Sequence, residues 1–192
     1  MTHRVLFITH PDVVIDASVP VPEWPLSDRG LARMRVCARQ PWLHGVGALW
    51  SSTERKACDG AAILADALGL QPRTLAALGE NDRSATGYLP RAEFEAVADA
   101  FFASPDESAR GWETARAAQV RIVAAVETVL SESPADCDVA IVAHGGVGAL
   151  LLCHLLGDRV SRRFDQPAGS GGNWFSFARD NRRVLTEWQA ID

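Results

Sequence analysis

Two histidines in this sequence each follow a short apolar run that is typical of a buried strand. His10 comes directly after residues 5–8. His144 comes directly after residues 139–142. The carboxyl ends of the strands in an open parallel sheet line the binding crevice, so we expect the two imidazoles to meet there and to take part in chemistry. The remaining histidines lack this placement and are interpreted as surface or packing residues: His3, His44 and His154.

Two adjacent cations follow a third apolar run, residues 48–50. The segment 51–57 reads Ser-Ser-Thr-Glu-Arg-Lys-Ala, which places Arg55 and Lys56 in the first turn of a predicted helix. A helix N-terminus already carries partial positive charge, so each cation is disfavoured there by a few tenths to about 1 kcal/mol unless an anion binds. We interpret this turn as a candidate anion pocket. The alternative is that both cations point to solvent and Glu54 offsets one of them.

A loop carboxylate is the fourth candidate. Glu80 follows the apolar run 75–78, and it can act as a general acid or base if it faces the same crevice. Taken alone, it is an ordinary loop residue.

The elements that must position these residues alternate between apolar strands and amphipathic helices. This alternation predicts an α/β fold, a three-layer α/β/α sandwich with a mostly parallel central sheet. The expected strands are residues 4–8, 48–50 and 139–142, followed by a hairpin of 174–178 and 184–188. The expected helices are 27–40 with Ser27 as cap, 53–69 with Thr53 as cap and Gly69 at its end, 91–103, 111–132 and 147–156.

Length and composition exclude several classes of protein. The chain has 192 residues, 47% apolar and 22% charged, which suits a single domain, residues 1–192, with one continuous core. A net charge of -5 gives no basic field for nucleic acid. No apolar run reaches the roughly 20 residues of a membrane span, and no signal-peptide pattern occurs, so we expect a cytoplasmic protein that binds no membrane. No spacing of the cysteines indicates a disulfide framework or a metal site: Cys37, Cys58, Cys137 and Cys153.

Two stretches are longer than ordinary connections and are expected to form or cover the site. They are residues 11–25 and the segment 79–111, which we assign as a cap or lid. The glycine-rich stretch 168–172 is expected to form a turn before the hairpin. The hairpin carries Trp174 and Trp188, and it packs either internally or against a second copy in a homodimer; the sequence leaves these two open.

Taken in order, these elements resemble the histidine phosphatase superfamily, also called the phosphoglycerate mutase-like family, over residues 4–188. The most specific match is the apolar strand followed by His144-Gly145-Gly146, where the family has His-Gly-Gly. The other matches are Thr9-His10-Pro11 for Arg-His-Gly, residues 26–30 for Leu-Thr-x-x-Gly, residues 51–57 for Ser-Ser-x-x-x-Arg-Ala, and residues 78–80 for a Leu-x-Glu loop.

The resemblance implies a phosphatase-type hydrolase that acts on a small phosphomonoester without a cofactor or metal. His10 takes the phosphoryl group, His144 holds its oxygens, Glu80 protonates the leaving oxygen, and water then hydrolyses the phosphohistidine. A mutase is the alternative within the family, and hydrolysis is favoured because mutases tend to be longer. The phosphate-binding positions expected at this site are Lys56, Thr9, Ser52 and Gly145, with Arg55 and Arg83 as nearby cations that compensate for lost positive charge if they point inward.

The sequence departs from the family pattern at positions that bear positive charge. Thr9 replaces the first arginine and Lys56 the second, and lysine is a point charge rather than a fork. Asp16 stands where the family often has an asparagine that contacts phosphate. An Asp16 that faced the pocket would complete a change of two charge units, each worth about 4 kcal/mol at contact distance. The sequence therefore predicts a weak or selective phosphatase, with a degraded member that binds a phosphorylated ligand or partner without turnover as the alternative.

A serine hydrolase is a rival from another enzyme class. The glycine-rich stretch places Ser170 in an approximate nucleophile elbow, and His144-Gly145-Gly146 is similar to an oxyanion-hole loop. In that fold the catalytic histidine follows the serine, whereas no histidine follows His154 here. The chain order therefore disfavours this reading.

Overall fold

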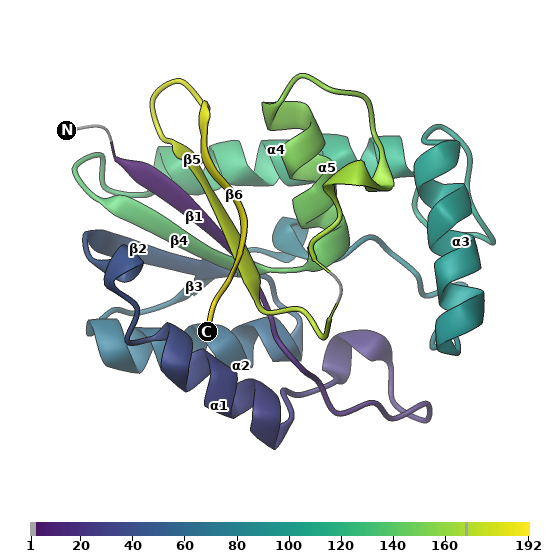
Figure 1. Ribbon diagram of the computed structural model, residues 1–192, viewed down its shortest axis with the longest axis horizontal. Helices are drawn as coiled ribbons and strands as arrows, with labels where there is room; N and C mark the ends of the chain where they lie inside the picture. The colour runs from purple at the N-terminus through teal and green to yellow at the C-terminus, as the bar shows by residue number, and fades with distance from the viewer. Residues whose placement is uncertain (1–2, 168) are drawn as a thin grey trace.

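A six-stranded sheet forms the centre of the computed structural model, which describes residues 3–167 and 169–192 (Figure 1). The strands are β1 Arg4–Thr9, β2 Val46–Ser51, β3 Arg73–Thr74, β4 Asp138–Ala143, β5 Asn173–Ala178 and β6 Val184–Ala190. Their order across the sheet is β3-β2-β4-β1-β5-β6. The first four in this order pair in parallel, and β5 and β6 are antiparallel. The mostly parallel sheet confirms the predicted fold class; the two-residue strand β3 was not predicted.

Helices cover both faces of this sheet. They are α1 Asp28–Cys37, α2 Arg55–Leu68, α3 Arg91–Ala103, α4 Ala115–Glu132 and α5 Gly145–Leu155. In Figure 1, α1 and α2 lie on one face, α4 and α5 lie on the other, and α3 stands at the right of the view, past the end of α4. One apolar cluster fills the space between the sheet and the layer of α4 and α5, and a second fills the space between the sheet and the layer of α1 and α2. A third cluster joins α3 to α4 and α5. None of the helices in the described part of the chain is long and apolar enough to cross a bilayer.

The helix ends follow the expected chemistry with three corrections. Ser27 caps α1 by accepting from the Gly30 N–H, and Gly69 ends α2 with φ of 67°. The expected cap at Thr53 is wrong, because the backbone leaves the extended state only after Glu54. The other two helix starts also move: α4 begins at Ala115 after a Thr114 cap, and α5 begins at Gly145 rather than 147.

A close backbone approach ties the loop after β1 to α1. The Ser27 N–H donates to the Asp12 carbonyl at 2.9 Å. A Cβ atom on Gly30 would lie 2.1 Å from the same oxygen, so only glycine fits there. The glycine of the Leu-Ser-x-x-Gly pattern therefore has a steric cause. The contact holds the backbone at Asp12, two residues after His10, against the start of α1.

The C-terminal hairpin packs internally. The Trp174 ring stacks on Trp42 with centroids 4.2 Å apart. Trp188 meets Phe175 edge-on at 4.8 Å, and its indole N–H donates to the Phe164 carbonyl. Both tryptophans therefore have partners within the same chain.

Candidate active site

The parallel register brings the two histidines to one edge of the sheet. Strands β1 and β4 are neighbours, and Thr9 pairs with Ala143 at their carboxyl ends. The next residue on each strand is a histidine. The rings of His10 and His144 consequently lie with centroids 5.2 Å apart at an angle of 66°.

His10 is held in one tautomer by its own backbone neighbour. Its Nδ1 lies 2.9 Å from the Pro11 carbonyl oxygen, which can only accept. Nδ1 therefore carries the proton, and Nε2 keeps a free lone pair. Burial lowers the pKa of His10 to about 3, with His144 and Lys56 adding to the effect. A neutral ring with a free Nε2 is the form in which imidazole acts as a nucleophile.

His144 is fully buried behind His10. Its Nε2 lies 2.7 Å from the Ser52 hydroxyl and 3.4 Å from Oε1 of Glu54. Its Nδ1 is buried and has no partner among the residues that the structure describes. Burial lowers the pKa of His144, although the nearby Glu54 and Glu80 carboxylates oppose the shift. The His144 ring is therefore neutral, and a neutral ring has a single N–H with which to donate a hydrogen bond.

A buried ion pair occupies the start of α2. Lys56 is only 3% exposed, and its ammonium donates to Oε2 of Glu54 at 2.5 Å and to the Val21 carbonyl at 2.9 Å. The other oxygen of Glu54 accepts from the Glu80 backbone N–H at 2.7 Å. Burial raises the pKa of Glu54, but His144 and Lys56 outweigh it and bring the pKa down to about 2. The charge of Lys56 is therefore already matched by a carboxylate.

Glu80 lies at the N-terminus of α5 on the wall of a cavity. Its carboxylate accepts from the backbone N–H groups of Gly146 at 3.0 Å and Val147 at 2.9 Å. These bonds satisfy helix donors that would otherwise lack partners, which explains why α5 begins at Gly145. Gly145 is also confined sterically, because a Cβ there would lie 2.3 Å from the Gln166 side chain.

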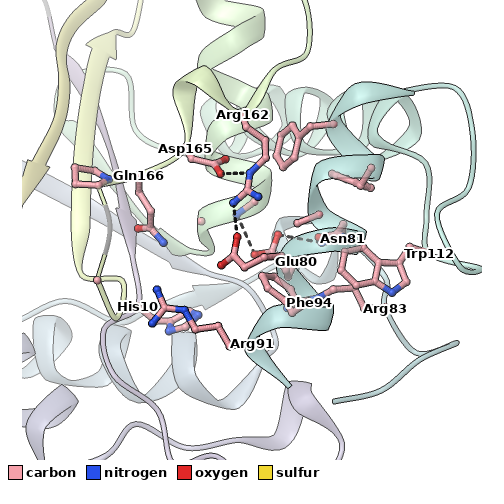
Figure 2. Close-up of a pocket in the computed structure, with 18 residues that line it drawn as sticks. His10, Glu80, Asn81, Arg83, Arg91, Phe94, Trp112, Arg162, Asp165 and Gln166 are labelled. Atoms are coloured by element: carbon pink, nitrogen blue, oxygen red, sulfur yellow. Dashed lines mark hydrogen bonds and ion pairs between the residues drawn. The ribbon is translucent and has the colours of Figure 1, made fainter. Parts of the chain in front are cut away.

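The cavity beside His10 has a volume of about 570 Å³ (Figure 2). Its walls combine the strand-end loops with α3, and charged side chains of both signs line it: Glu80, Arg83, Arg91, Glu95, Arg162 and Asp165. A second cavity of about 440 Å³ also reaches His10, and its lining is more apolar: Val13, Ile15, Val21, Trp24, Tyr88 and Leu89. His10 thus lies where the two cavities meet.

Two arginines line both cavities. The Arg83 guanidinium lies over the Phe94 ring at 5.1 Å and the Trp112 ring at 5.7 Å. Figure 2 shows the Arg91 side chain extending from the start of α3 toward His10. Neither makes an ion pair with a carboxylate of the described residues. These two guanidinium groups are therefore available to an anion, whereas Lys56 is not.

Comparison with known proteins settles the family. The family model described as "Histidine phosphatase superfamily (branch 1)" matches residues 19–188. The chain belongs to the histidine phosphatase superfamily. The match begins after Thr9-His10-Pro11, the segment that departs from the Arg-His-Gly pattern. A comparison with curated proteins found no match.

Solved structures of this superfamily share the fold across nearly the whole chain. A mycobacterial glucosyl-3-phosphoglycerate phosphatase in complex with inorganic phosphate is 22% identical, with a TM-score of 0.76 and coverage of 97% of this chain and 94% of that one. Bacillus stearothermophilus YhfR is 18% identical, with a TM-score of 0.79 and coverage of 99% of this chain and 100% of that one. A putative alpha-ribazole-5'-P phosphatase from Escherichia coli is 18% identical, with a TM-score of 0.71 and coverage of 100% of this chain and 99% of that one.

Several of the expected phosphate-binding residues do not line either cavity in the described part of the chain. Thr9 is fully buried, and its hydroxyl donates to Oε1 of Gln166 at 2.7 Å and accepts from the Asn173 N–H at 3.0 Å. Arg55 is exposed, and the described lining of the two cavities does not include it. Ser52 is also fully buried, and its hydroxyl lies 2.7 Å from Nε2 of His144.

Asp16 does not add its charge to the pocket. It is exposed, and its carboxylate accepts from the Ser18 N–H at 2.9 Å and from the Ser18 hydroxyl at 2.6 Å. The expected change of two charge units at the phosphate site depended on an Asp16 that faces the pocket. Because Asp16 faces solvent, it does not contribute to such a change. Glu54 supplies a carboxylate at the strand ends instead. The sequence reading treated Glu54 only as an offset of one solvent-exposed cation.

An arginine-centred network on the cavity wall was also missed. Arg162 pairs with Glu95 at 2.9 Å, Asp99 at 2.7 Å and Asp165 at 2.8 Å. It ties α3 to the segment that follows α5. Burial raises the pKa of Asp165, although its bond to Arg162 opposes the shift. No cluster of three or more His, Cys, Asp or Glu in the described residues could hold a metal ion.

Proposed function

We propose that this protein hydrolyses a small phosphomonoester through a phosphohistidine at His10. The observation that carries the proposal is the tautomer of His10, whose protonated Nδ1 leaves Nε2 free at the junction of two cavities. Membership of the superfamily supports phosphatase chemistry. So do the structural neighbours, which include a glucosyl-3-phosphoglycerate phosphatase and a putative alpha-ribazole-5'-P phosphatase.

In the proposed first step, Nε2 of His10 attacks phosphorus and the bond to the leaving oxygen breaks. His144 and the unpaired Arg83 and Arg91 stabilise the charge on the phosphoryl oxygens. Glu80, on the same cavity wall as His10, gives a proton to the leaving oxygen. In the second step, water attacks the phosphohistidine, Glu80 accepts its proton, and inorganic phosphate leaves.

In this proposal the segment 79–111 forms a cap over the site. It contributes Arg83 and the whole of α3, and residues of α3 form one wall of the larger cavity. The Arg162 network joins α3 to the chain after α5. The cap therefore brings the cations and encloses the organic part of the substrate.

The test is turnover of a broad panel of phosphomonoesters at several pH values, with inorganic phosphate as the readout. We expect His10→Ala to abolish the turnover of every substrate found. His154→Ala, which removes an exposed histidine of α5, is the matched control and keeps full activity. Turnover that survives His10→Ala, or a panel without any turnover, contradicts the proposal.

Binding of a phosphorylated ligand without turnover is the second candidate, and the Glu54–Lys56 pair is the observation that favours it. A carboxylate at the strand ends weakens the stabilisation of negative charge in the transition state at His10. It weakens less the binding of those parts of the ligand that lie farther away in the cavities. The two candidates are separated by incubating the protein with its ligand. Only the hydrolase acquires a phosphoryl group on His10.

A further inference from the structure

The loop that carries Glu80 is fixed by groups from other parts of the chain. Residues 79–90, all of them described, form no helix or strand between the short turn η3, Ala76–Leu78, and α3. The Glu80 N–H donates to Glu54 at 2.7 Å, and its carbonyl accepts from Arg121 at 3.2 Å. Its carboxylate accepts from N–H groups at the start of α5. The position of Glu80 therefore depends on partners outside its own loop.

Arg121, on α4, uses its whole guanidinium group on this loop and on one carboxylate. Nη1 donates to the carbonyls of Ala77 at 2.8 Å and Gly79 at 2.9 Å, and Nη2 donates to that of Glu80 at 3.2 Å. Nε and Nη2 also donate to the two oxygens of Glu113 at 3.0 Å and 2.7 Å. These contacts match the five N–H donors of a guanidinium group. The side chain is thus fully committed to holding the loop.

Glu113, the partner of Arg121, holds the other side of the same loop. Its Oε2 accepts from the Asp82 N–H at 3.2 Å, and its own N–H donates to the Asp82 carbonyl at 2.9 Å. The ion pair therefore contacts the backbone both before and after Glu80. We call Arg121 and Glu113 the loop clamp.

The loop clamp is attached to a rigid part of the molecule. On α4, the neighbouring Ile122 is fully buried in the core. Arg121 is only 26% exposed and Glu113 only 18%. A bidentate pair that is largely withdrawn from solvent holds its geometry better than a pair on the surface.

The position of Glu80 matters for proton transfer. A proton donor must lie within hydrogen-bond distance of the leaving oxygen, and a misplacement of about 1 Å can cost about a hundredfold in rate. The described lining of the two cavities includes neither Arg121 nor Glu113. The loop clamp can therefore affect turnover only through the loop that it holds.

We infer that Arg121 is a positioning residue for proton transfer, and that together with Glu113 it holds the Glu80 carboxyl at the leaving oxygen. The inference rests on the proposed function, because it takes Glu80 as the group that gives the proton. It adds a second layer to the site, in which α4 determines where the proton donor lies.

A role of Arg121 in folding alone has a different consequence. A variant that merely lowers the amount of active protein reduces kcat/KM by the same factor for every substrate. A variant with a misplaced proton donor loses activity only where the leaving oxygen needs a proton. Dependence on the leaving group is therefore the readout that separates the two roles.

The experiment measures kcat/KM with two aromatic phosphomonoesters. Phenyl phosphate has a leaving oxygen like that of tyrosine, whose pKa is about 10, so its departure needs a proton. The second ester, 2,4-dinitrophenyl phosphate, releases a stable anion that needs none. In Arg121→Gln we expect kcat/KM to fall at least about tenfold with phenyl phosphate and less than about threefold with the dinitrophenyl ester. Glu80→Gln should show the same split with a larger loss.

A second variant guards against misfolding of the first. Arg121→Gln leaves the Glu113 carboxylate without its counter-charge, whereas the double variant Arg121→Gln/Glu113→Gln removes both charges. We expect the double variant to show the same split, because both residues hold one loop. Arg116→Gln is the matched control: it removes an equal charge from an exposed position of α4 that pairs with Asp106, and it keeps both rates. Thermal unfolding verifies that each variant is folded.

Three results overturn the inference. They are an equal loss with both esters in the variants of the loop clamp, no loss with either ester, and a Glu80→Gln variant without the split. All three leave hydrolysis through His10 standing, because the natural chain still turns the esters over. A natural chain that leaves even the activated dinitrophenyl ester intact contradicts the proposed function itself, and this inference falls with it.

Discussion

The edge of the sheet where β1, β2 and β4 end and the segment 79–111 lie beside the same cavity, yet their cations differ. The buried cation at the edge is paired with a carboxylate, and those on the segment that line the cavity have no such partner in the part of the chain that the structure describes. At the strand ends Lys56 is buried and paired with Glu54, and both histidines are neutral. On the segment, Arg83 and Arg91 line the cavity without a carboxylate partner among the described residues. The edge holds the two histidines, and the segment holds two guanidinium groups that have no carboxylate partner within residues 3–167 and 169–192.

The difference follows from the cost of burying charge. An unpaired cation in the interior loses its hydration and is tolerated only with a partner. A cation on a partly exposed segment keeps much of its hydration, and Arg83 gains further support from the faces of Phe94 and Trp112. A chain that carries Thr9 and Lys56 in place of two arginines therefore has positive charge at the cavity from the segment 79–111 instead.

The largest expected effect tests the pairing at the edge. Lys56→Met leaves the Glu54 carboxylate buried without its counter-charge, so we expect the free energy of unfolding to fall by about 3–5 kcal/mol. The double variant Lys56→Met/Glu54→Leu removes both charges and should recover most of this loss. Urea unfolding measures both. A single variant that loses less than about 1 kcal/mol would show that the edge does not depend on the pair.

A smaller effect concerns the pH dependence of stability at the edge. The pKa of His10 is about 3 in the folded chain against 6.5 for the free side chain. The unfolded chain therefore binds the extra proton first as the pH falls, and stability is lost between pH 6.5 and 3. A drop from pH 6.5 to about 4.5 should cost about 2 kcal/mol from this residue alone. Unfolding curves of His10→Ala should show a slope that is flatter by this amount, and equal slopes would refute the assignment.

The next effect concerns Arg83 on the segment 79–111. Arg83→Gln removes a free guanidinium from the cavity while the fold keeps its core, so we expect kcat/KM to fall about tenfold, or about 1.4 kcal/mol. Arg110→Gln is the control, because Arg110 lies on the same segment and pairs with Glu93 on the surface. Steady-state kinetics with the best substrate compares them. Equal activity of the two variants would contradict a role for the segment 79–111 in binding the phosphoryl group.

The smallest effect is expected at Arg55, which the sequence offers as a cation beside Lys56 that compensates for lost positive charge if it points inward. Arg55 is exposed at the start of α2, whereas its neighbour Lys56 is buried. Arg55→Gln should therefore change kcat/KM by less than about twofold, within the range of surface substitutions. A tenfold loss would show that the side chain turns inward when substrate binds.

Much of the fold could be predicted because it follows from local rules. The apolar runs predicted β1, β2 and β4, and parallel pairing then placed His10 beside His144 at one edge. Ser27 and Gly69 act at the helix ends as their types suggest. The two-residue β3 has too little pattern to be recognised, since its pairing depends on β2 alone.

The direction of individual side chains could not be predicted. Arg55 and Lys56 are adjacent in the sequence, yet only Lys56 is buried, where it donates to the Val21 carbonyl. The backbone N–H of Glu80 in turn fixes one oxygen of Glu54. Asp16 was considered as an inward charge, yet a local bond to Ser18 holds it in solvent. Partners from distant parts of the chain determine these positions, so no spacing in the sequence reveals them.

The central claim is that His10 carries the phosphoryl group. The most direct measurement is to incubate the protein with phenyl phosphate, quench the reaction at high pH, where phosphohistidine survives, and identify the modified residue by peptide mass spectrometry. The account predicts a phosphoryl group on His10 that disappears in His10→Ala and persists in His154→Ala. Turnover without a phosphoryl group on His10, or a phosphoryl group on another residue, would contradict it.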